Sequence, residues 1–122
     1  MLRLKDHSLL IQKAFVGGVW TDATGGATVT VDNPATGTLI GSVPDCSAED
    51  TERAIAAAAE AFKSWRLTTA AERARLLERW HDLLLDNADD LALIMTSEQG
   101  KPLAEARGEI LYGASFIKWF AE

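Results

Sequence analysis

The clearest hydrophobic pattern lies in the last quarter of the chain. Apolar residues recur there at steps of three and four, the spacing of one helical face, at Leu103, Ala106, Ile110, Ala114, Ile117 and Ala121. A second apolar set lies off this line, at Tyr112, Phe116, Trp119 and Phe120. A helix with apolar residues on two sides needs covering on two sides. No helix-ending residue precedes Glu122, so we expect the sequence to be cut off within a longer protein.

Three more helical segments are predicted between residues 47 and 99. Ser47 is a cap before a stripe formed by Ile55, Ala58, Ala59, Phe62 and Trp65. Thr69 and Glu72 match the capping box, ahead of a second stripe at Leu77, Trp80, Leu84, Ala88, Leu91 and Met95. Residues 87–90 are expected to break that stripe into two helices. Gly100 is then expected to end the last of them in a left-handed conformation, and Pro102 to open the final helix.

Residues 14–43 predict a small antiparallel β meander, preceded by one or two helical turns at residues 8–13. Two β-prone runs flank Gly17 and Gly18, which is typical of a hairpin whose turn needs positive φ. Residues 27–32 alternate between apolar and polar, and residues 38–43 form the partner strand after a turn at residues 33–37. The fold class expected for the chain is therefore α+β, mostly helical, with three or four helices at residues 47–122.

The composition of the chain excludes several classes of function. The 122 residues carry a net charge of −6, which argues against phosphate-backbone binding and against an anionic membrane surface. No stretch approaches the roughly 20 apolar residues that a membrane helix needs, so the cytoplasm is the expected location. The single cysteine, Cys46, excludes an internal disulfide and a multi-thiolate metal site.

Few residues outside the helical pattern suggest chemistry. Cys46 follows Asp45, which disfavours a reactive thiolate, so a loop or half-buried thiol is the better interpretation than a nucleophile. His81 is better explained as a residue at the edge of an amphipathic helix than as a general base. The acidic residues near Asp50 and near Asp89 are better explained as helix caps than as cation ligands. No Gly-x-Gly-x-x-Gly motif is present to form a dinucleotide loop.

The residues from 98 to 122 also carry a family resemblance. The string Glu-Gln-Gly-Lys-Pro-Leu-Ala-Glu-Ala at residues 98–106 is followed by Gly-Glu-Ile at 108–110, Tyr112, Phe116 and Trp-Phe-Ala-Glu at 119–122. This string resembles the aldehyde dehydrogenase superfamily, and within it the succinate-semialdehyde dehydrogenases. Nearly the whole chain shares the resemblance, but members of the family are several times longer, so the chain resembles only their N-terminal part.

The resemblance implies a parent protein with an α/β fold and a Rossmann-type cofactor domain, of which residues 1–122 would be an incomplete N-terminal portion. That parent would oxidise succinate semialdehyde, or a related semialdehyde, to the acid with NADP or NAD, and would form a homo-oligomer, a dimer or a tetramer. The family's catalytic and cofactor-binding residues lie outside the matching segment. The 122 residues alone are therefore expected to be inactive, to bind no cofactor and to self-associate.

Two candidate sites depend on this resemblance. Gly108 and Gly113 each cost roughly 1 kcal/mol of helix stability relative to alanine, so a packing or an access reason is expected. The access reason is that the final helix borders the substrate tunnel of the family, with Gly108 and Tyr112 as wall residues. The second site is a monovalent cation site, implied at the positions of Val31, Asp32 and Glu98.

Two alternative functions stay open. The chain could be a self-contained protein-interaction module that binds a partner through its apolar C-terminal helix, since exposed apolar patches mark interaction surfaces. It could also belong to an aldehyde dehydrogenase that acts on a different aldehyde.

Overall fold

The computed structural model describes residues 2–122 and divides them into two compact units. The first, which we call the helical unit, contains residues 2–10, 33–38 and 69–122. The second, the ribbon unit, contains residues 11–32 and 39–68. None of the helices in the described part of the chain is long and apolar enough to cross a membrane.

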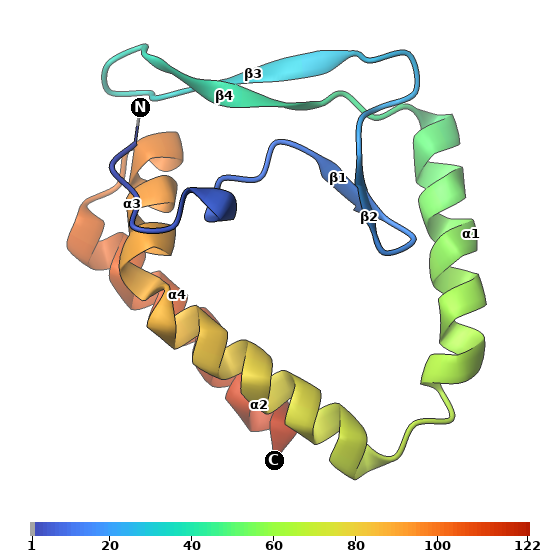
Figure 1. The fold of residues 1–122 in the computed structure, drawn as a ribbon. Helices are drawn as coiled ribbons and strands as arrows, with labels where there is room; N and C mark the ends of the chain where they lie inside the picture. The colour runs from blue at the N-terminus through green and yellow to red at the C-terminus, as the bar shows by residue number, and fades with distance from the viewer. Residues whose placement is uncertain (1) are drawn as a thin grey trace. The chain divides into compact units, whose positions relative to one another are not determined.

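Three helices form the helical unit: α2 (Ala70–Asp86), α3 (Ala88–Gln99) and α4 (Leu103–Ala121). In Figure 1, α2 and α4 run side by side, and α3 follows at the end of α2. Small side chains fill the contacts between these helices, and the buried ones are Ala88, Ala92, Ala106, Ala114 and Ala121. Alanine lets two helices approach closely but buries little apolar area, so the core of this unit is thin.

The ends of these helices follow the expected signals. The Thr69 hydroxyl accepts from the backbone N–H of Glu72, whose carboxylate accepts from the backbone N–H of Thr69, which completes the capping box. The predicted break at residues 87–90 is confirmed, because α2 ends at Asp86 and α3 begins at Ala88. Gly100 has a φ of 78°. Pro102 stands one position before α4 rather than inside its first turn.

The N-terminal segment lies against the start of α3. The carboxylate of Asp90 accepts hydrogen bonds from the backbone N–H groups of Lys5 at 3.1 Å and Asp6 at 2.8 Å. Leu4 is buried beside them. The helical turn predicted at residues 8–13 is wrong in its position: a single 3₁₀ turn, η1, spans His7–Leu9. Its cap is Asp6, which accepts from Ser8, because a carboxylate competes well for the free N–H groups of a first turn.

The ribbon unit begins with a hairpin of two short strands, β1 (Ala14–Val16) and β2 (Val19–Thr21). Gly17 and Gly18 form its turn with φ of 60° and 83°, as the sequence predicts. The rings of Phe15 and Trp20 stand opposite each other in the ladder, with centroids 4.9 Å apart. This aromatic pair packs across the hairpin.

A longer antiparallel ribbon follows, formed by β3 (Thr28–Asp32) and β4 (Leu39–Pro44). The predicted continuous meander is corrected here: β1 and β2 form one two-stranded sheet, and β3 and β4 form another. Both sheets are antiparallel and the helices dominate, so the α+β class expected for the chain is confirmed. The β3–β4 register shifts near the turn, because Val31 pairs with Gly41 while Asp32 pairs with Leu39.

The remaining helix, α1 (Ala48–Trp65), begins at the predicted cap Ser47. Its central run of alanines favours a helix, but the larger apolar residues of the expected stripe, Ile55, Phe62 and Trp65, remain exposed. The periodicity of α1 thus marks a face that the described residues leave uncovered.

Candidate functional site

The outward side of α4 carries the most distinctive group of side chains in the helical unit. Tyr112, Phe116, Trp119 and Phe120, which we call the aromatic face, recur at helical spacing and are 66%, 48%, 74% and 75% exposed. Ala106, Ala114 and Ala121 lie on the opposite side of the same helix and are buried. The second apolar side predicted from the sequence is therefore present and uncovered.

The aromatic side chains of this face are partly ordered by one another. The rings of Tyr112 and Phe116, one turn apart, meet edge to face at 81° with centroids 4.8 Å apart. Ser115, Phe116, Trp119 and Phe120 line an open hollow of about 490 Å³. The Ser115 hydroxyl donates a hydrogen bond to the backbone carbonyl oxygen of Tyr112 at 2.7 Å, so it is not free to act as an acid or a base. The hollow is suited to hold an apolar group, and no ionisable side chain lines it.

Gly108 lies one turn before Tyr112 on the same side of α4. A Cβ at Gly108 would meet no atom within 4 Å, and the same is true of Gly113. The simpler explanation for these two glycines was close contact between helices. Within the described residues, no neighbouring helix comes close to either glycine. The missing side chain at Gly108 instead faces open space among the described residues.

The three positions implied for a monovalent cation fall in different units. Val31 and Asp32 end β3 in the ribbon unit, whereas Glu98 lies in the last turn of α3 in the helical unit. Neither unit contains the whole set, so the cation site stays a prediction. Among residues 2–122, no group of three or more His, Cys, Asp or Glu side chains could hold a metal ion.

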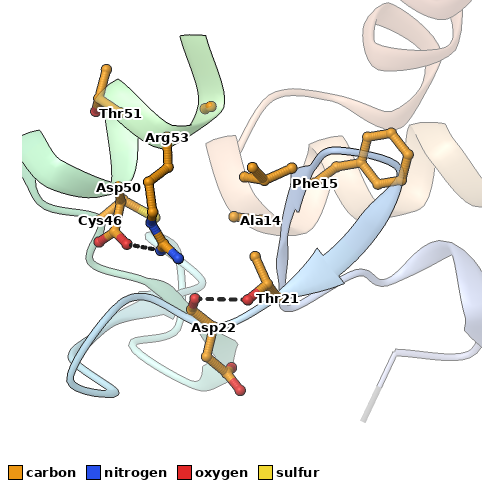
Figure 2. Close-up of a pocket in the computed structure, with 10 residues that line it drawn as sticks. Ala14, Phe15, Thr21, Asp22, Cys46, Asp50, Thr51 and Arg53 are labelled. Carbon is orange, nitrogen blue, oxygen red and sulfur yellow. Dashed lines mark hydrogen bonds and ion pairs between the residues drawn. The ribbon is translucent and has the colours of Figure 1, made fainter. Parts of the chain in front are cut away.

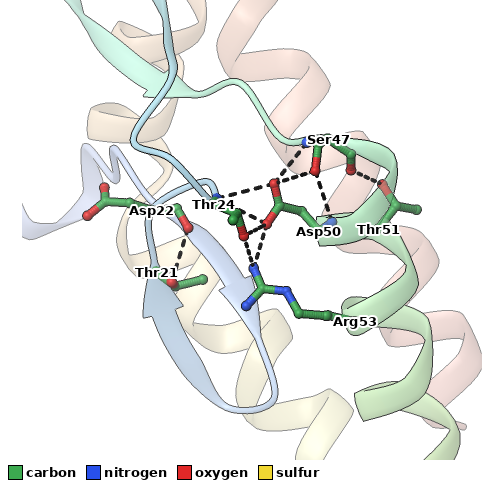
Figure 3. Close-up of polar contacts among 7 residues, drawn as sticks. All are labelled: Thr21, Asp22, Thr24, Ser47, Asp50, Thr51 and Arg53. Atoms are coloured by element: carbon green, nitrogen blue, oxygen red, sulfur yellow. Dashed lines mark hydrogen bonds and ion pairs between the residues drawn. The ribbon is translucent and has the colours of Figure 1, made fainter.

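A second group of interest lies at the start of α1. The carboxylate of Asp50, 5% exposed, accepts from the backbone N–H and the hydroxyl of Thr24, from Ser47 and from Arg53 (Figure 3). The hydroxyl of Thr24, 2.7 Å away, and the backbone N–H of Ser47 lower the pKa of Asp50 well below its ordinary range. The sequence predicts a cap here, but its link to Thr24 could not be seen from spacing. This carboxylate is a structural acceptor and cannot serve as a base near neutral pH.

Asp50 also borders a hollow of about 230 Å³ that contains the only cysteine. Figure 2 shows Arg53 reaching from α1 to Asp50, with Ala14 and Phe15 on the hairpin and Cys46 in the loop before α1. The Cys46 thiol is exposed, as the loop interpretation predicts. Nucleophilic catalysis needs a base within hydrogen-bond reach, and the neighbouring carboxylate is fully occupied as an acceptor.

His81 offers little more. Its Nδ1 lies 3.0 Å from a carboxylate oxygen of Asp82, the next residue, and the Asp82 side chain is mostly in solvent. Both residues lie on α2. This placement fits the predicted residue at the edge of an amphipathic helix.

The described residues do not fit a dinucleotide. A dinucleotide pyrophosphate binds to free N–H groups at the start of a helix that follows a parallel strand. Both sheets here are antiparallel, and the Gly17–Gly18 pair joins two strands of a hairpin. The first turns of α1 and α2 are already closed by capping boxes, formed by Ser47 with Asp50 and by Thr69 with Glu72. Neither helix start can therefore accept a phosphate without losing its cap.

Comparison with known proteins places the chain in one family. The family model described as the aldehyde dehydrogenase family matches residues 20–122. Among curated relatives, the chain is 58% identical over 121 residues to a glutarate-semialdehyde dehydrogenase of Pseudomonas aeruginosa. It is 55% identical to a 3-sulfolactaldehyde dehydrogenase of Pseudomonas putida, and 52% identical to the NADP(+) succinate-semialdehyde dehydrogenase of Escherichia coli. Each alignment covers at least 99% of the chain and about a quarter of the relative.

Solved structures agree in fold. An aldehyde dehydrogenase from Brucella melitensis biovar abortus superimposes with a TM-score of 0.98 at 59% identity, over 99% of this chain and 25% of that chain. A succinate-semialdehyde dehydrogenase from Burkholderia pseudomallei gives 0.95 at 57% identity, over 98% and 25%. An NAD-dependent aldehyde dehydrogenase from Sinorhizobium meliloti gives 0.86 at 38% identity, over 96% and 24%. Both NADP and NAD thus occur among these similar enzymes.

The resemblance noted in the sequence is confirmed by the family match, by the shared fold and by an alignment at 58% identity that covers 99% of the chain. The chain belongs to the aldehyde dehydrogenase family.

Proposed function

We propose that the chain is the N-terminal part of the cofactor-binding domain of an NAD(P)-dependent semialdehyde dehydrogenase. The observation that carries this proposal is the identity of 52–58% with three such aldehyde dehydrogenases over at least 99% of the chain. The chain spans about a quarter of the length of these relatives. The remaining three quarters would supply the nucleophile, the general base and the cofactor site, for which the described residues provide no groups.

The substrate we propose is succinate semialdehyde or a closely related semialdehyde. The three relatives are named for glutarate semialdehyde, 3-sulfolactaldehyde and succinate semialdehyde. All three compounds are short aldehydes that carry an acidic group at the far end. A substrate of that class needs a site with an apolar wall along its carbon chain and a cationic group near its acidic end. The aromatic face of α4 contains no cation, so it could supply only the apolar wall.

Within that protein, the aromatic face of α4 would form part of the wall of the aldehyde channel, with Gly108 and Tyr112 bordering it. The supporting observations are the exposure of Tyr112 and the open space above Gly108. The cation set Val31, Asp32 and Glu98 is proposed as a structural site completed by residues beyond this segment. We also propose that the complete protein assembles as a homodimer or homotetramer in the cytoplasm.

A chimera tests this proposal directly. The chain would replace the matching 121 residues of the Pseudomonas aeruginosa glutarate-semialdehyde dehydrogenase, and NAD(P)⁺ reduction would be followed with glutarate and succinate semialdehydes. We expect an active chimera, whereas the 122-residue chain alone should give no turnover. A chimera that folds and assembles like the parent enzyme but has lost activity entirely would count against the proposal.

The wall is tested in the same chimera by Gly108→Met. A side chain that enters the channel should raise KM for bulky aldehydes more than for short ones, by about tenfold if one good apolar contact is replaced by a clash. Gly113→Met is the matched control, because Gly113 is equally open but lies on a different side of α4. Equal kinetics for both variants across aldehydes of different size would remove Gly108 from the wall.

The exposed aromatic face also favours a second function, that of a self-contained module which binds a protein partner through α4. The chimera separates the two. A self-contained module has no reason to complete a foreign enzyme, so activity of the chimera would exclude this second function as the role of the segment.

A further inference from the structure

An ion pair joins the loop between α3 and α4 to the second turn of α4. The ammonium group of Lys101, just before α4 begins, contacts the carboxylate oxygen Oε1 of Glu109, eight positions along the chain. The side chain of Lys101 is only 20% exposed, whereas lysine side chains are mostly in solvent. A cation withdrawn from water is unfavourable unless it is paired, so Lys101 holds Glu109 more firmly than a surface lysine would.

The loop that carries Lys101 is itself held in place. Gly100 ends α3 in the left-handed conformation, and a Cβ there would lie 3.1 Å from Cγ of Pro34, so the turn between β3 and β4 packs closely against it. Pro102 follows Lys101 and restricts the backbone of Lys101 to extended conformations. Lys101 is therefore a fixed point in the helical unit, and Glu109 is where α4 is attached to it.

Glu109 lies on one flank of α4, between its buried side and its open side. Successive residues of a helix are about 100° apart around its axis. Ala106 is 0% exposed, and Gly108, which faces open space among the described residues, lies about 160° away from it. Glu109 stands between the two, about 60° from Ala106 and about 100° from Gly108. A restraint on this flank resists rotation of α4 about its axis, and such a rotation would change the direction in which Gly108 faces.

The opposite flank of α4 carries a second ion pair, which is more exposed. Nε of Arg107 lies 3.0 Å from Oδ1 of Asp89 in the first turn of α3. These two side chains are 51% and 60% exposed, and water screens an ion pair of this kind so strongly that it contributes little. The two pairs therefore differ mainly in the burial of the cation, and the Lys101–Glu109 pair is the stronger restraint on α4.

We propose that Lys101 and Glu109 are positioning residues, which set the rotation of α4 and thereby the length of aldehyde that the channel accepts. This inference rests on the proposed function, in which Gly108 and Tyr112 border the channel. Tyr112 follows Gly108 by one turn, so any rotation of α4 moves both wall positions together. The reacting groups would lie beyond this segment and stay in place. Loss of the ion pair should therefore change KM in a way that depends on the aldehyde, and leave kcat alone.

Kinetics of the chimera described above test this role. Lys101→Met keeps most of the side-chain length without the charge, and Glu109→Gln keeps the shape. In each variant the ratio of KM for glutarate semialdehyde to KM for succinate semialdehyde should change by about threefold or more, because the two substrates differ by one methylene. The double variant should change the ratio no further, since the same interaction is already lost.

Arg107→Met is the matched control, because it breaks the exposed ion pair on the other flank of α4. We expect it to leave both the KM ratio and kcat unchanged. An unchanged ratio in Lys101→Met and Glu109→Gln would overturn the proposal. So would an equal change in Arg107→Met, or a fall in kcat of the same size for both aldehydes, which is what a merely structural role would produce.

Hydrogen exchange in the 122-residue chain supplies a measurement that needs no activity. Lys101→Met should accelerate exchange at the amides of residues 107–110 by about fivefold or more, whereas Arg107→Met should not. Far-UV circular dichroism checks that each variant is folded. Equal exchange in the two variants would contradict the restraint on α4. An inactive chimera would count against the proposed function, whereas an active chimera with an unchanged KM ratio would overturn only the positioning role.

Discussion

The carboxylate of Asp50 holds Thr24, a residue 26 positions earlier, through both its backbone N–H at 3.1 Å and its hydroxyl at 2.7 Å. This contact fixes the loop after the first hairpin to the first turn of α1. Thr24→Val should cost about 2 kcal/mol of unfolding free energy, since it removes a hydrogen bond to a charged acceptor. Thr21→Val is the matched control, because the Thr21 hydroxyl makes only a local bond to the next carbonyl, and we expect a change below about 0.5 kcal/mol. Urea unfolding followed by circular dichroism measures both, and equal losses would show that the link to Asp50 is not special.

Lowering the pH should lower the unfolding free energy of the ribbon unit. The pKa of Asp50 in the folded chain lies well below its ordinary value of 3.8, chiefly because the Thr24 hydroxyl and the Ser47 N–H donate to the carboxylate. A group with a depressed folded pKa contributes its full stability above the unfolded pKa and loses it as the pH falls below that value. The urea midpoint should therefore fall between about pH 5 and about pH 2. Asp50→Asn should already be less stable at neutral pH and should show a smaller fall, and a pH dependence equal to that of the unmodified chain would contradict this assignment.

The N-terminal segment should detach when Asp90 is removed. Asp90→Ala deletes the acceptor for the backbone N–H groups of Lys5 and Asp6, so hydrogen exchange at these two amides should accelerate by about tenfold or more. Asp89→Ala is the neighbouring control: its carboxylate forms exposed ion pairs with Lys5 and Arg107, and such pairs contribute little. If both variants exchange alike, Leu4 and not the carboxylate holds the segment.

Two glycines should respond in opposite directions to the same substitution. Gly100→Ala should cost about 1–2 kcal/mol, because φ is 78° and the new Cβ would lie 3.1 Å from Cγ of Pro34. Gly108→Ala should stabilise the chain by up to about 1 kcal/mol, because its site is open and helical. Urea titrations of both variants check this pair, and a destabilised Gly108→Ala would mean that something in the chain does occupy the space above it.

Local signals made the helices predictable, because caps and helical ends depend on residues a few positions apart. Ser47, Thr69 and Gly100 fulfil their predicted roles, and the break before Ala88 is where the pattern places it. The separation of the two hairpins was not predictable in the same way. Each hairpin has its own turn signal, but whether β2 pairs with β3 depends on the path of the loop between them, which Asp50 fixes from a distance.

The candidate sites also differ in how far the sequence alone could predict them. Periodicity alone separates the aromatic face of α4 from the line of alanines, but which of the two sides is buried came from the structure. The open space at Gly108 required coordinates, since sequence reasoning favours close packing for a helical glycine. The backbone N–H of Ser42 donates a hydrogen bond to the side chain of Gln12, 30 positions earlier. The hydrophobic pattern of the sequence gave no sign of this bond except the neighbouring Gly41. Val31, Asp32 and Glu98 remain a prediction, because they belong to two different units.

The exposure of the aromatic residues has a spectroscopic consequence. All four tryptophans are at least 43% exposed: Trp20, Trp65, Trp80 and Trp119. Indole emission depends on contact with water, so the isolated folded chain should emit almost as far to the red as the unfolded one. Unfolding should therefore change the tryptophan fluorescence very little, although it should change the circular dichroism signal strongly. Trp119, at 74%, would shift to the blue only when another surface covers α4, and so provides an optical reporter of docking rather than of folding.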